Sequence, residues 1–231
     1  YLINEKPTSS KDPFALRRAA IGLLRTIIEN NLTVQIRDLI DYFIKIYLKQ
    51  GVTQSNNEVN KELITFFRER MKNILKEKKI RTDIIEASIS SHLSDDFLEL
   101  YKKTLIMNKF ISKDLGKNAV STYKRASNIL DQETLDSKNG PNAVLFKQDE
   151  EKELFERINN IRKVFTLREE RKDYEKHLKL LSETKSSTDK FFDKVKVNDE
   201  NQDLKNNRLE LLQILCSTFN SFIDFSKLEG T

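Results

Sequence analysis

Scarce glycine and proline limit the fold of this sequence more than any other feature, since its 231 residues include only five glycines and three prolines. Sheet-rich folds need many tight turns, and those turns depend on glycine and proline to reach the required backbone angles. Apolar residues recur at intervals of three and four rather than two, apart from the short run Val195–Lys196–Val197. The sequence therefore predicts an all-α protein with few, long helices.

Capping residues predict where the first helices begin and end. The pair Asp12-Pro13 supplies an N-cap acceptor and a proline at the first helical position. Thr33 is the expected cap of a second helix, which Gly51 ends in a left-handed conformation. Ser55 and Glu58 have the spacing of a capping box at the start of a third helix. The second helix carries apolar residues at helical spacing: Ile36, Leu39, Ile40, Phe43, Tyr47 and Leu48.

The second half of the chain predicts further helices around one clear linker. A sixth helix is expected from about Ser112 to Leu130, and the linker follows at Asp131 to Asn142. Ser187 is a candidate N-cap for a later helix. The final helix is expected from about Gln202 to Phe225.

Residue types that carry catalysis or bind metals are few and scattered. The two histidines, His92 and His177, lie far apart, and neither belongs to an HExxH or His-Asp pair. Nucleotide-binding and nucleophile motifs do not occur, so we predict no catalytic residue and no metal site. The single cysteine, Cys216, lies in an apolar stretch, which favours a buried structural thiol in a reducing compartment.

The net charge of +5 and the pI near 9.1 favour a polyanionic partner. An excess this small also occurs in proteins that never bind nucleic acid. The longest uncharged run, Leu211 to Ile223, is too short to span a membrane, and no signal peptide is visible. We therefore expect a soluble, cytoplasmic protein with no membrane partner.

Three segments are more specific than a generic helical pattern. They read DPFALRRAAIGLL at residues 12–24, KRASNIL at 124–130, and FFDKVKVNDENQDLKNNRLELL at 191–212, the last followed by FNSFIDFSKL at 219–228. In this order and with these gaps they closely resemble the C-terminal part of the bacterial glycyl-tRNA synthetase β subunit. The resemblance covers essentially the whole chain.

The resemblance implies two helical domains and a division of labour between subunits. Residues 112–231 would form a DALR-type anticodon-binding bundle, and residues 1–111 would be the tail of an HD-like helical region. The His-Asp metal pair of HD folds is missing, because His92 is followed by Leu93. Glycine activation, ATP and Mg would belong to the α subunit, so this chain would hold no cofactor. The implied partners are tRNA-Gly, the α subunit and the rest of the β subunit.

One face of the sixth helix is a candidate RNA-binding surface. Polar and cationic residues spaced four, three and four apart share this face: Lys117, Ser121, Lys124 and Asn128, with Arg125 beside them. The opposite face is apolar and carries Leu115, Ala119, Ala126, Ile129 and Leu130. Lysines could contact phosphates while the amide and hydroxyl groups reach base edges. The alternative is a solvated helix face.

Other cations are candidates for RNA contact. Lys196 stands where the family usually has methionine after FFDKV, which adds positive charge near the expected RNA surface. The third helix is rich in cations that could flank a tRNA stem or simply be solvated: Arg68, Arg70, Lys72, Lys76, Lys78 and Lys79. Arg208 shares the apolar stripe of the final helix, so a structural ion pair, with Asp193 as the candidate partner, competes with phosphate contact.

Two functions of different classes follow. The first is the tRNA-binding, anticodon-arm portion of the β subunit of a glycine–tRNA ligase, which supports glycylation without catalysing it. The second is a helical scaffold that docks other subunits and makes no direct RNA contact.

Overall fold

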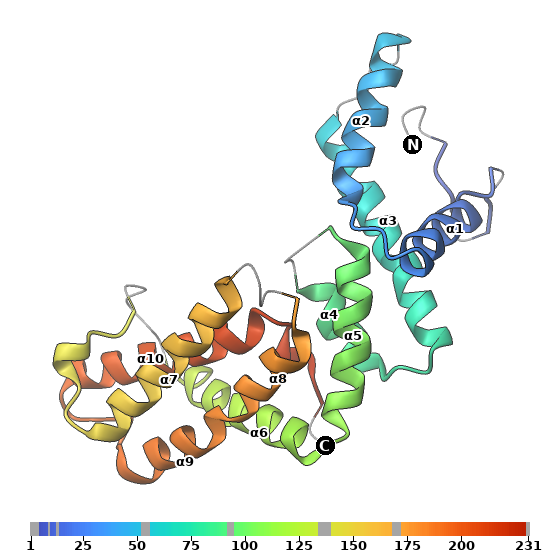
Figure 1. The fold of residues 1–231 in the computed structure, drawn as a ribbon. Coiled ribbons are helices and arrows are strands. Elements are labelled where there is room, and N and C mark those ends of the chain that lie inside the picture. Colours follow the sequence, from blue (N-terminus) through green and yellow to red (C-terminus); the bar gives the residue numbers. More distant parts are fainter. Residues whose placement is uncertain are drawn as a thin grey trace. The chain divides into compact units, whose positions relative to one another are not determined.

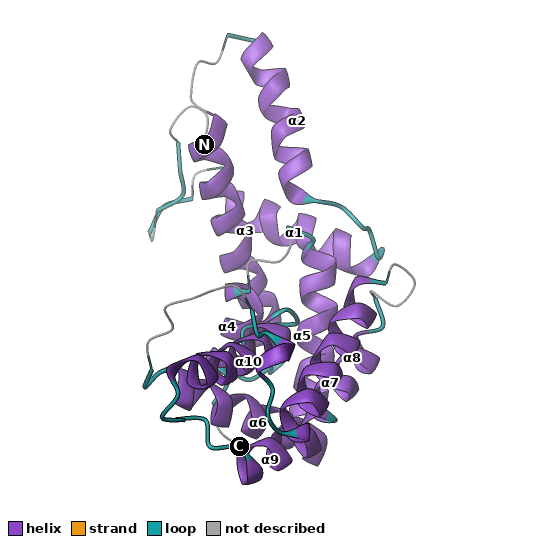
Figure 2. Ribbon diagram, turned by 90° about the vertical axis from the view of Figure 1, so that its left-hand side faces the viewer, coloured by secondary structure: helices purple, strands orange, loops and turns teal. Residues whose placement is uncertain are grey.

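The computed structural model describes residues 5–8, 10–12, 14–51, 56–91, 95–133, 140–167 and 172–229. Within this described part the regular structure is helical and no strand forms (Figures 1 and 2), which confirms the all-α prediction. An isolated bridge joins Gln35 to Asp96. The α-helices are α1 Leu16–Glu29, α2 Ile36–Lys49, α3 Asn56–Glu77, α4 Thr82–Ser90, α5 Phe97–Ile111, α6 Asp114–Leu130, α7 Asp149–Thr166, α8 Tyr174–Ser182, α9 Thr184–Lys194 and α10 Gln202–Asn220. Two 3₁₀ turns are η1 Ala143–Leu145 and η2 Phe225–Lys227.

The chain forms two compact units, Tyr1–Leu105 and Ile106–Thr231. The border between them falls inside α5, whereas the sequence places the domain boundary between residues 111 and 112, just after that helix. The assignment of a helical domain to residues 1–111 and of an anticodon-binding domain to residues 112–231 stays a prediction.

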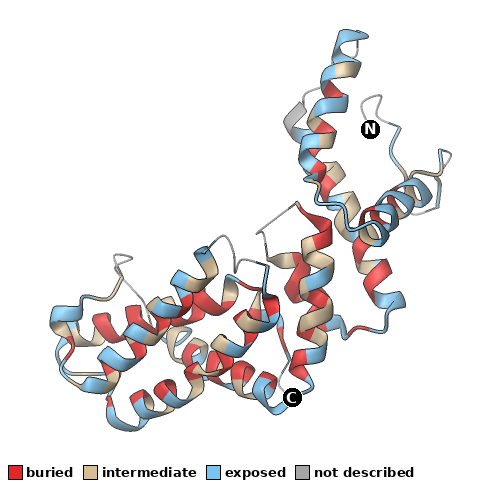
Figure 3. Ribbon diagram, in the orientation of Figure 1, coloured by how far each residue is buried: buried red, intermediate tan, exposed pale blue. Residues whose placement is uncertain are grey.

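The first unit is organised around α3, against which α1, α2 and α4 pack. Its core contains apolar side chains with no exposed surface, among them Leu24, Met71, Leu75, Ile84 and Ile85. Buried residues occur in both halves of α3 and along α4 (Figure 3). The core of the first unit thus lies between α3 and the helices that pack against it.

The helix starts of this unit differ from the expected caps. The N-cap of α1 is Ala15, with φ 53°, rather than Asp12. The Asp12 carboxylate still binds the first turn, because it accepts from the backbone N–H groups of Leu16 at 2.8 Å and Arg17 at 3.0 Å. Thr33 does not cap α2, whose N-cap is Gln35, since the extended chain before α2 pairs with the segment before α5. Pro13 and Ser55 lie outside the described residues.

The apolar residues of α2 are only partly buried. Phe43 is 52% exposed, Tyr47 46% and Leu48 37%. The buried side chains of α2 are Ile36 and Ile40 of this set, together with Ile44, one per turn. The described contacts of α2 are chiefly with α3, so a single isoleucine line is covered and the aromatic side chains beside it face outward. Gly51, with φ 92°, follows the helix as expected.

The second unit packs α6 to α10 together (Figure 1, green to red). Helix α10 contacts both α6 and α7, and α9 lies along α7. Tyr123 of α6 lies against Phe219 and Phe225, with ring centroids 6.0 and 5.7 Å away. Helix α9 begins at Thr184, so Ser187 lies inside the helix rather than at its cap, and its hydroxyl donates to the Thr184 carbonyl.

Other sequence predictions for this unit can be compared with the structure. Cys216 is buried, as expected, and His177 is buried with its ring stacked on Phe165 at 4.1 Å. Helix α10 ends at Asn220, earlier than the expected Phe225, which instead begins η2. The middle of the predicted linker, like His92 in the first unit, lies outside the described residues. None of the described helices has the length and apolarity to cross a membrane.

Candidate nucleic-acid interface

The polar face predicted for the sixth helix lies on the outside of α6. Lys117, Ser121 and Asn128 are exposed and Lys124 is half-buried. We call these four residues the α6 stripe. The Lys117 ammonium lies 3.8 Å from the carboxylate of Asp114, an exposed pair that leaves the cation largely available to a ligand. The structure therefore presents the stripe as predicted, and whether it contacts RNA stays a prediction.

The opposite face of α6 is buried in its middle and less so at its two ends, where Ile129 and Leu130 are half-buried. Ala119 and Ala126 have no exposed surface, but Leu115, expected on the buried face, is 47% exposed. Gly116 occupies the inward position instead, and a Cβ atom there would meet the Phe110 carbonyl oxygen at 2.2 Å. The first turn of α6 therefore lies directly against the backbone that ends α5 at Gly116, while Leu115 beside it stays largely exposed.

Arg125, beside the stripe, is engaged with α9. Its guanidinium lies 3.3 Å from the Asp189 carboxylate and 4.3 Å from the centroid of the Phe192 ring. Such a cation–π contact and an exposed ion pair each contribute a modest stabilisation. Arg125 therefore helps to hold α6 against α9, and any contact it makes with RNA would compete with these interactions.

The cations predicted on the third helix divide into two groups. Arg68 pairs with Asp95 at 3.6 Å, Lys72 pairs with Glu86 at 3.1 Å, and the Arg70 guanidinium lies 4.5 Å from the centroid of the Phe66 ring. The second group lies at and just beyond the end of α3, where the side chains are exposed: Lys76, Lys78 and Lys79. Only this second group is placed in the open, as a phosphate-binding surface requires.

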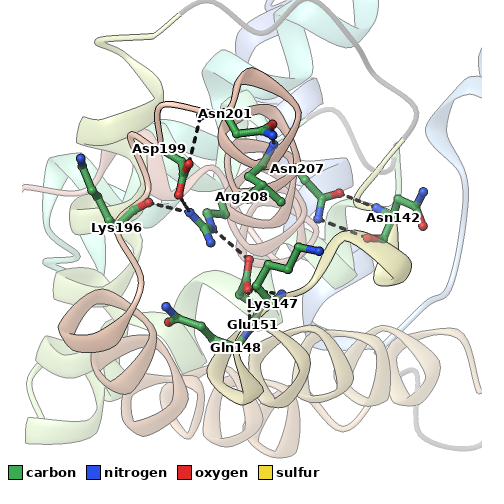
Figure 4. A network of polar contacts seen from close by, with 10 residues as sticks. Asn142, Lys147, Gln148, Glu151, Lys196, Asp199, Asn201, Asn207 and Arg208 are labelled. Carbon is green, nitrogen blue, oxygen red and sulfur yellow. Dashed lines mark hydrogen bonds and ion pairs between the residues drawn. The ribbon is translucent and has the colours of Figure 1, made fainter.

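Arg208 is the centre of a buried polar network (Figure 4). Its Nε donates to Glu151 at 3.0 Å, and one terminal nitrogen donates to Asp199 at 2.7 Å and to the backbone carbonyl of Lys196 at 2.9 Å. The Arg208 and Glu151 side chains are 4% and 1% exposed. Asp193, the partner expected from the sequence, is exposed on α9, and that assignment is wrong.

Each acid of the network also binds backbone N–H groups. The second oxygen of Glu151 accepts from Lys147 at 2.8 Å and Gln148 at 2.9 Å, at the start of α7. Asp199 accepts from Asn201, which caps α10. The Asn201 hydrogen bond, assisted by Arg208, lowers the pKa of Asp199. Burial alone would lower the pKa of Arg208. The hydrogen bonds to Glu151 and Asp199 outweigh this effect, so the pKa of Arg208 is raised.

The network fixes the loops at one end of the second unit. Asn207, next to Arg208, receives the Asn142 N–H at 2.6 Å and donates to the Asn142 carbonyl at 3.2 Å. Figure 4 shows these contacts joining the segment before η1, the start of α7 and the loop between α9 and α10. The Lys196 backbone is held here while its side chain is 71% exposed and points away from Arg208.

Sequence reasoning missed Glu151 as the partner of Arg208. Glu151 belongs to an acidic run in the first turn of α7, and it binds the backbone N–H groups at the start of that helix. The Gln148–Glu151 spacing of a capping box was the available local signal. The pairing with Arg208 spans 57 residues, so no local pattern could reveal it.

Two family models match separate parts of this chain. Residues 119–226 match the model described as DALR anticodon binding domain, so most of the second unit belongs to that class of helical domain. Residues 1–90 match the model described as glycyl-tRNA synthetase beta subunit. The chain belongs to the glycyl-tRNA synthetase beta subunit family.

Named relatives agree with the two models. The glycine–tRNA ligase beta subunit of Rickettsia africae (strain ESF-5) is 37% identical over 227 residues, which cover 98% of this chain and 32% of that protein. The same subunit of Rhodospirillum centenum (strain ATCC 51521 / SW) is 36% identical over 236 residues, which cover 100% of this chain and 32% of that protein. The beta subunit of Cereibacter sphaeroides (strain ATCC 17029 / ATH 2.4.9) is 31% identical, and the match covers 100% of this chain and 34% of that protein. The chain spans about a third of the length of these relatives.

Proposed function

We propose that this chain is the tRNA-binding portion of the β subunit of a glycine–tRNA ligase and that it contacts the anticodon arm of tRNA-Gly. The observation that carries the proposal is the match of residues 119–226 to the DALR anticodon binding domain. The α6 stripe lies on the exposed side of that region and offers the mixture of ammonium, hydroxyl and amide groups that RNA recognition uses.

The proposed role within the enzyme is to bind and position the tRNA. Glycine activation with ATP and Mg would take place on the α subunit, and this chain would hold neither cofactor. The remaining partners would be the α subunit and the rest of the β subunit. As a component of an aminoacyl-tRNA synthetase in protein biosynthesis, the protein would act in the cytoplasm.

The recognition chemistry would combine two kinds of contact. The exposed lysines at the end of α3 and on α6, together with Lys196, attract phosphates without regard to sequence. Asn128 and Ser121 can form hydrogen bonds with the edges of unstacked bases. The Arg208 network keeps the ends of α7 and α10 in place, so that the second unit offers a rigid surface.

A second candidate, a subunit-docking scaffold, is favoured by the exposed side chains of α2. Tyr42 is 61% exposed, and it lies beside Phe43 with a ring-centroid distance of 5.5 Å. Aromatic side chains of this kind are enriched in the cores of protein interfaces. A scaffold would bind another part of the synthetase through such a face and would leave RNA contact to that part.

Binding to tRNA-Gly at several salt concentrations separates the two candidates. A tRNA-binding chain should bind the transcript with an affinity that falls steeply as salt rises, because phosphate contacts release counterions. Transcripts with a substituted anticodon should bind more weakly. A scaffold should instead bind the purified α subunit without RNA and show no tRNA affinity. The chain alone should support no glycine-dependent ATP–pyrophosphate exchange, and such activity would refute the proposed division of labour.

A further inference from the structure

Helix α2 carries a second apolar stripe beside the isoleucine line that packs on α3. Its residues are spaced at i, i+3, i+4 and i+7, so they share one face of the helix: Leu39, Tyr42, Phe43 and Ile46. We call these four residues the α2 stripe. Tyr42 and Phe43 are exposed, while Leu39 and Ile46 are half-buried. The exposed Tyr47 and Leu48 extend this apolar surface at the end of the helix.

The α2 stripe has the character of a docking surface. In the described part of the chain, most of the large apolar side chains that are exposed lie in the first unit, on or beside α1 and α2. Clustered apolar side chains of this kind mark interaction sites, whereas single ones are ordinary on protein surfaces. The i, i+3, i+4 and i+7 spacing is the one through which helices contact each other. The stripe therefore fits a helical partner with an apolar seam of its own.

Two exposed charges border the stripe and suggest the direction of the partner helix. Asp38 lies in the first turn of α2 and Lys49 in the last. Within the described residues neither side chain forms an ion pair. Helices carry acidic residues preferentially in their first turn and basic residues in their last. A partner helix antiparallel to α2 would place its acidic start near Lys49 and its basic end near Asp38.

The segment ahead of α1 runs beside α2 and α3. The Lys6 ammonium forms an ion pair with Glu62 of α3 at 2.7 Å. Two residues earlier in α3, the Asn60 amide donates to the carboxylate of Asp41, the neighbour of Tyr42 in α2. Polypeptide that precedes Lys6 is therefore brought close to the middle of α2.

Relatives of this chain have enough further polypeptide to supply such a helix. The match covers 32% of the Rickettsia africae subunit, so most of that protein lies outside it. This chain resembles the C-terminal part of the family, which places the further polypeptide ahead of residue 1. A segment joined through the chain before α1 has a high effective concentration next to α2. A separate subunit or a second copy lacks this advantage.

We propose that an amphipathic helix from the preceding part of the β subunit covers the α2 stripe. The helix packs its apolar seam on Tyr42 and Phe43 and runs antiparallel to α2. The inference rests on the proposed function, because it takes this chain to be a portion of a β subunit. The aromatic face is thereby used inside the subunit, and the α6 stripe stays available to tRNA.

Thiol labelling of the 231-residue chain and of the whole β subunit tests the proposal. Phe43→Cys places a thiol in the stripe, and Lys45→Cys places one on the exposed polar side of the same helix as a matched control. Both are made in a Cys216→Ala background. In the 231-residue chain the two thiols should react with N-ethylmaleimide at rates within about threefold of each other. In the whole subunit Phe43→Cys should react about tenfold more slowly, and Lys45→Cys at an unchanged rate.

Each other occupant of the stripe gives a different labelling pattern. Rapid labelling of Phe43→Cys in the whole subunit overturns the proposal. Slow labelling in the 231-residue chain also overturns it, because another part of this chain or a second copy would then cover the stripe. Protection that appears only after the α subunit or tRNA-Gly is added assigns the face to that partner and contradicts the proposal. Tyr42→Cys repeats the comparison at the neighbouring ring, and thermal melting checks that each variant is folded.

Binding of tRNA-Gly to the 231-residue chain distinguishes failure of the docking surface from failure of the proposed function. If tRNA-Gly binds in a salt-dependent way but Phe43→Cys stays reactive in the whole subunit, the docking assignment is wrong and the tRNA-binding function stands. If Phe43→Cys is protected in the whole subunit but tRNA-Gly does not bind, the docking surface stands and the tRNA-binding function fails.

Discussion

Arg208 lies among buried leucines of α10 with only 3% of its surface exposed. Its position among leucines in the sequence predicts both the burial and the need for an anionic partner, and the structure has both. The identity of the partner depends on which helices meet, and Glu151 comes from a helix 57 residues away. Burial of a side chain is thus encoded locally, whereas the choice of its partner is encoded by the tertiary fold.

Replacing Arg208 by Leu should destabilise the second unit by about 3–5 kcal/mol, because the Glu151 carboxylate would remain buried without its cation. Adding Glu151→Gln should restore part of the loss, since the neutral amide is less costly to bury. Urea unfolding followed by circular dichroism measures both effects. The control Arg162→Leu removes an exposed arginine from α7 and should cost no more than about 0.5 kcal/mol. A loss in Arg208→Leu as small as in this control would show that the network is dispensable.

Cys216 should be nearly inert toward alkylating agents in the folded protein. Burial raises the pKa of its thiol to about 12, so very little reactive thiolate exists at pH 8. Iodoacetamide labelling at pH 8 should therefore be roughly a hundredfold or more slower than in denaturant. The control is Ser217→Cys in a Cys216→Ala background, which moves the thiol to the exposed neighbouring position and should react rapidly. Equal rates at the two positions would contradict the burial of Cys216.

At the scale of helices, the sequence predicts which segments are helical better than it predicts which faces are covered. The spacing of Phe43, Tyr47 and Leu48 correctly indicates a helix, but in the described structure these side chains face outward. Periodicity identifies an apolar face and carries no information on whether a partner covers it. Leu115 of α6 illustrates the same limit, since it shares a face with the buried Ala119 and Ala126 but lies in the first turn and is 47% exposed.

Alanine at two helical glycines should have effects of opposite sign. Gly116→Ala places a Cβ atom 2.2 Å from a backbone oxygen, so either α6 or the end of α5 must move, at a cost of about 1–3 kcal/mol or more. Gly22→Ala in α1 meets no atom within 4 Å and should stabilise the chain by about 0.5–1 kcal/mol through helix propensity. Urea unfolding measures both. A neutral Gly116→Ala variant would mean that α6 does not approach the chain so closely.

The α6 stripe should read RNA more specifically than the lysines at the end of α3. The pair Lys124→Ala and Asn128→Ala should weaken binding to tRNA-Gly more than binding to a transcript with a substituted anticodon, because Asn128 can discriminate base edges. Alanine at Lys76, Lys78 and Lys79 should weaken both equally and reduce the salt slope by about one unit per lost phosphate contact.

The structure supplies a matched control for this comparison. Lys45 and Lys49 are exposed on α2, so alanine at both removes surface charge without touching either candidate surface. Filter binding at several salt concentrations gives the affinities, and thermal melting shows whether each variant is folded. If the Lys124/Asn128 variant melts normally and keeps the full anticodon preference, the stripe is a solvated face.

At the scale of the whole chain, the sequence predicts the helical class, and its motifs indicate the family that the comparisons confirm. The sequence does not predict which of the candidate cations form ion pairs with acidic side chains of the protein. Lys72 and Arg125 pair with acids on other helices, and Arg68 with an acid ahead of α5, and these partners depend on tertiary packing. The exposed lysines at the end of α3 are distinguished from them only in the structure.

The two compact units should unfold separately, because each has a core of its own. Met71 in the first unit and Leu215 in the second have no exposed surface, so alanine at either position should cost about 2–5 kcal/mol. Hydrogen exchange measured by mass spectrometry across a urea series assigns each transition to peptides of residues 1–105 or 106–231. Met71→Ala should shift only the transition of the first unit to lower urea, and Leu215→Ala only that of the second. A single transition that both variants shift equally would show that the chain folds as one cooperative body.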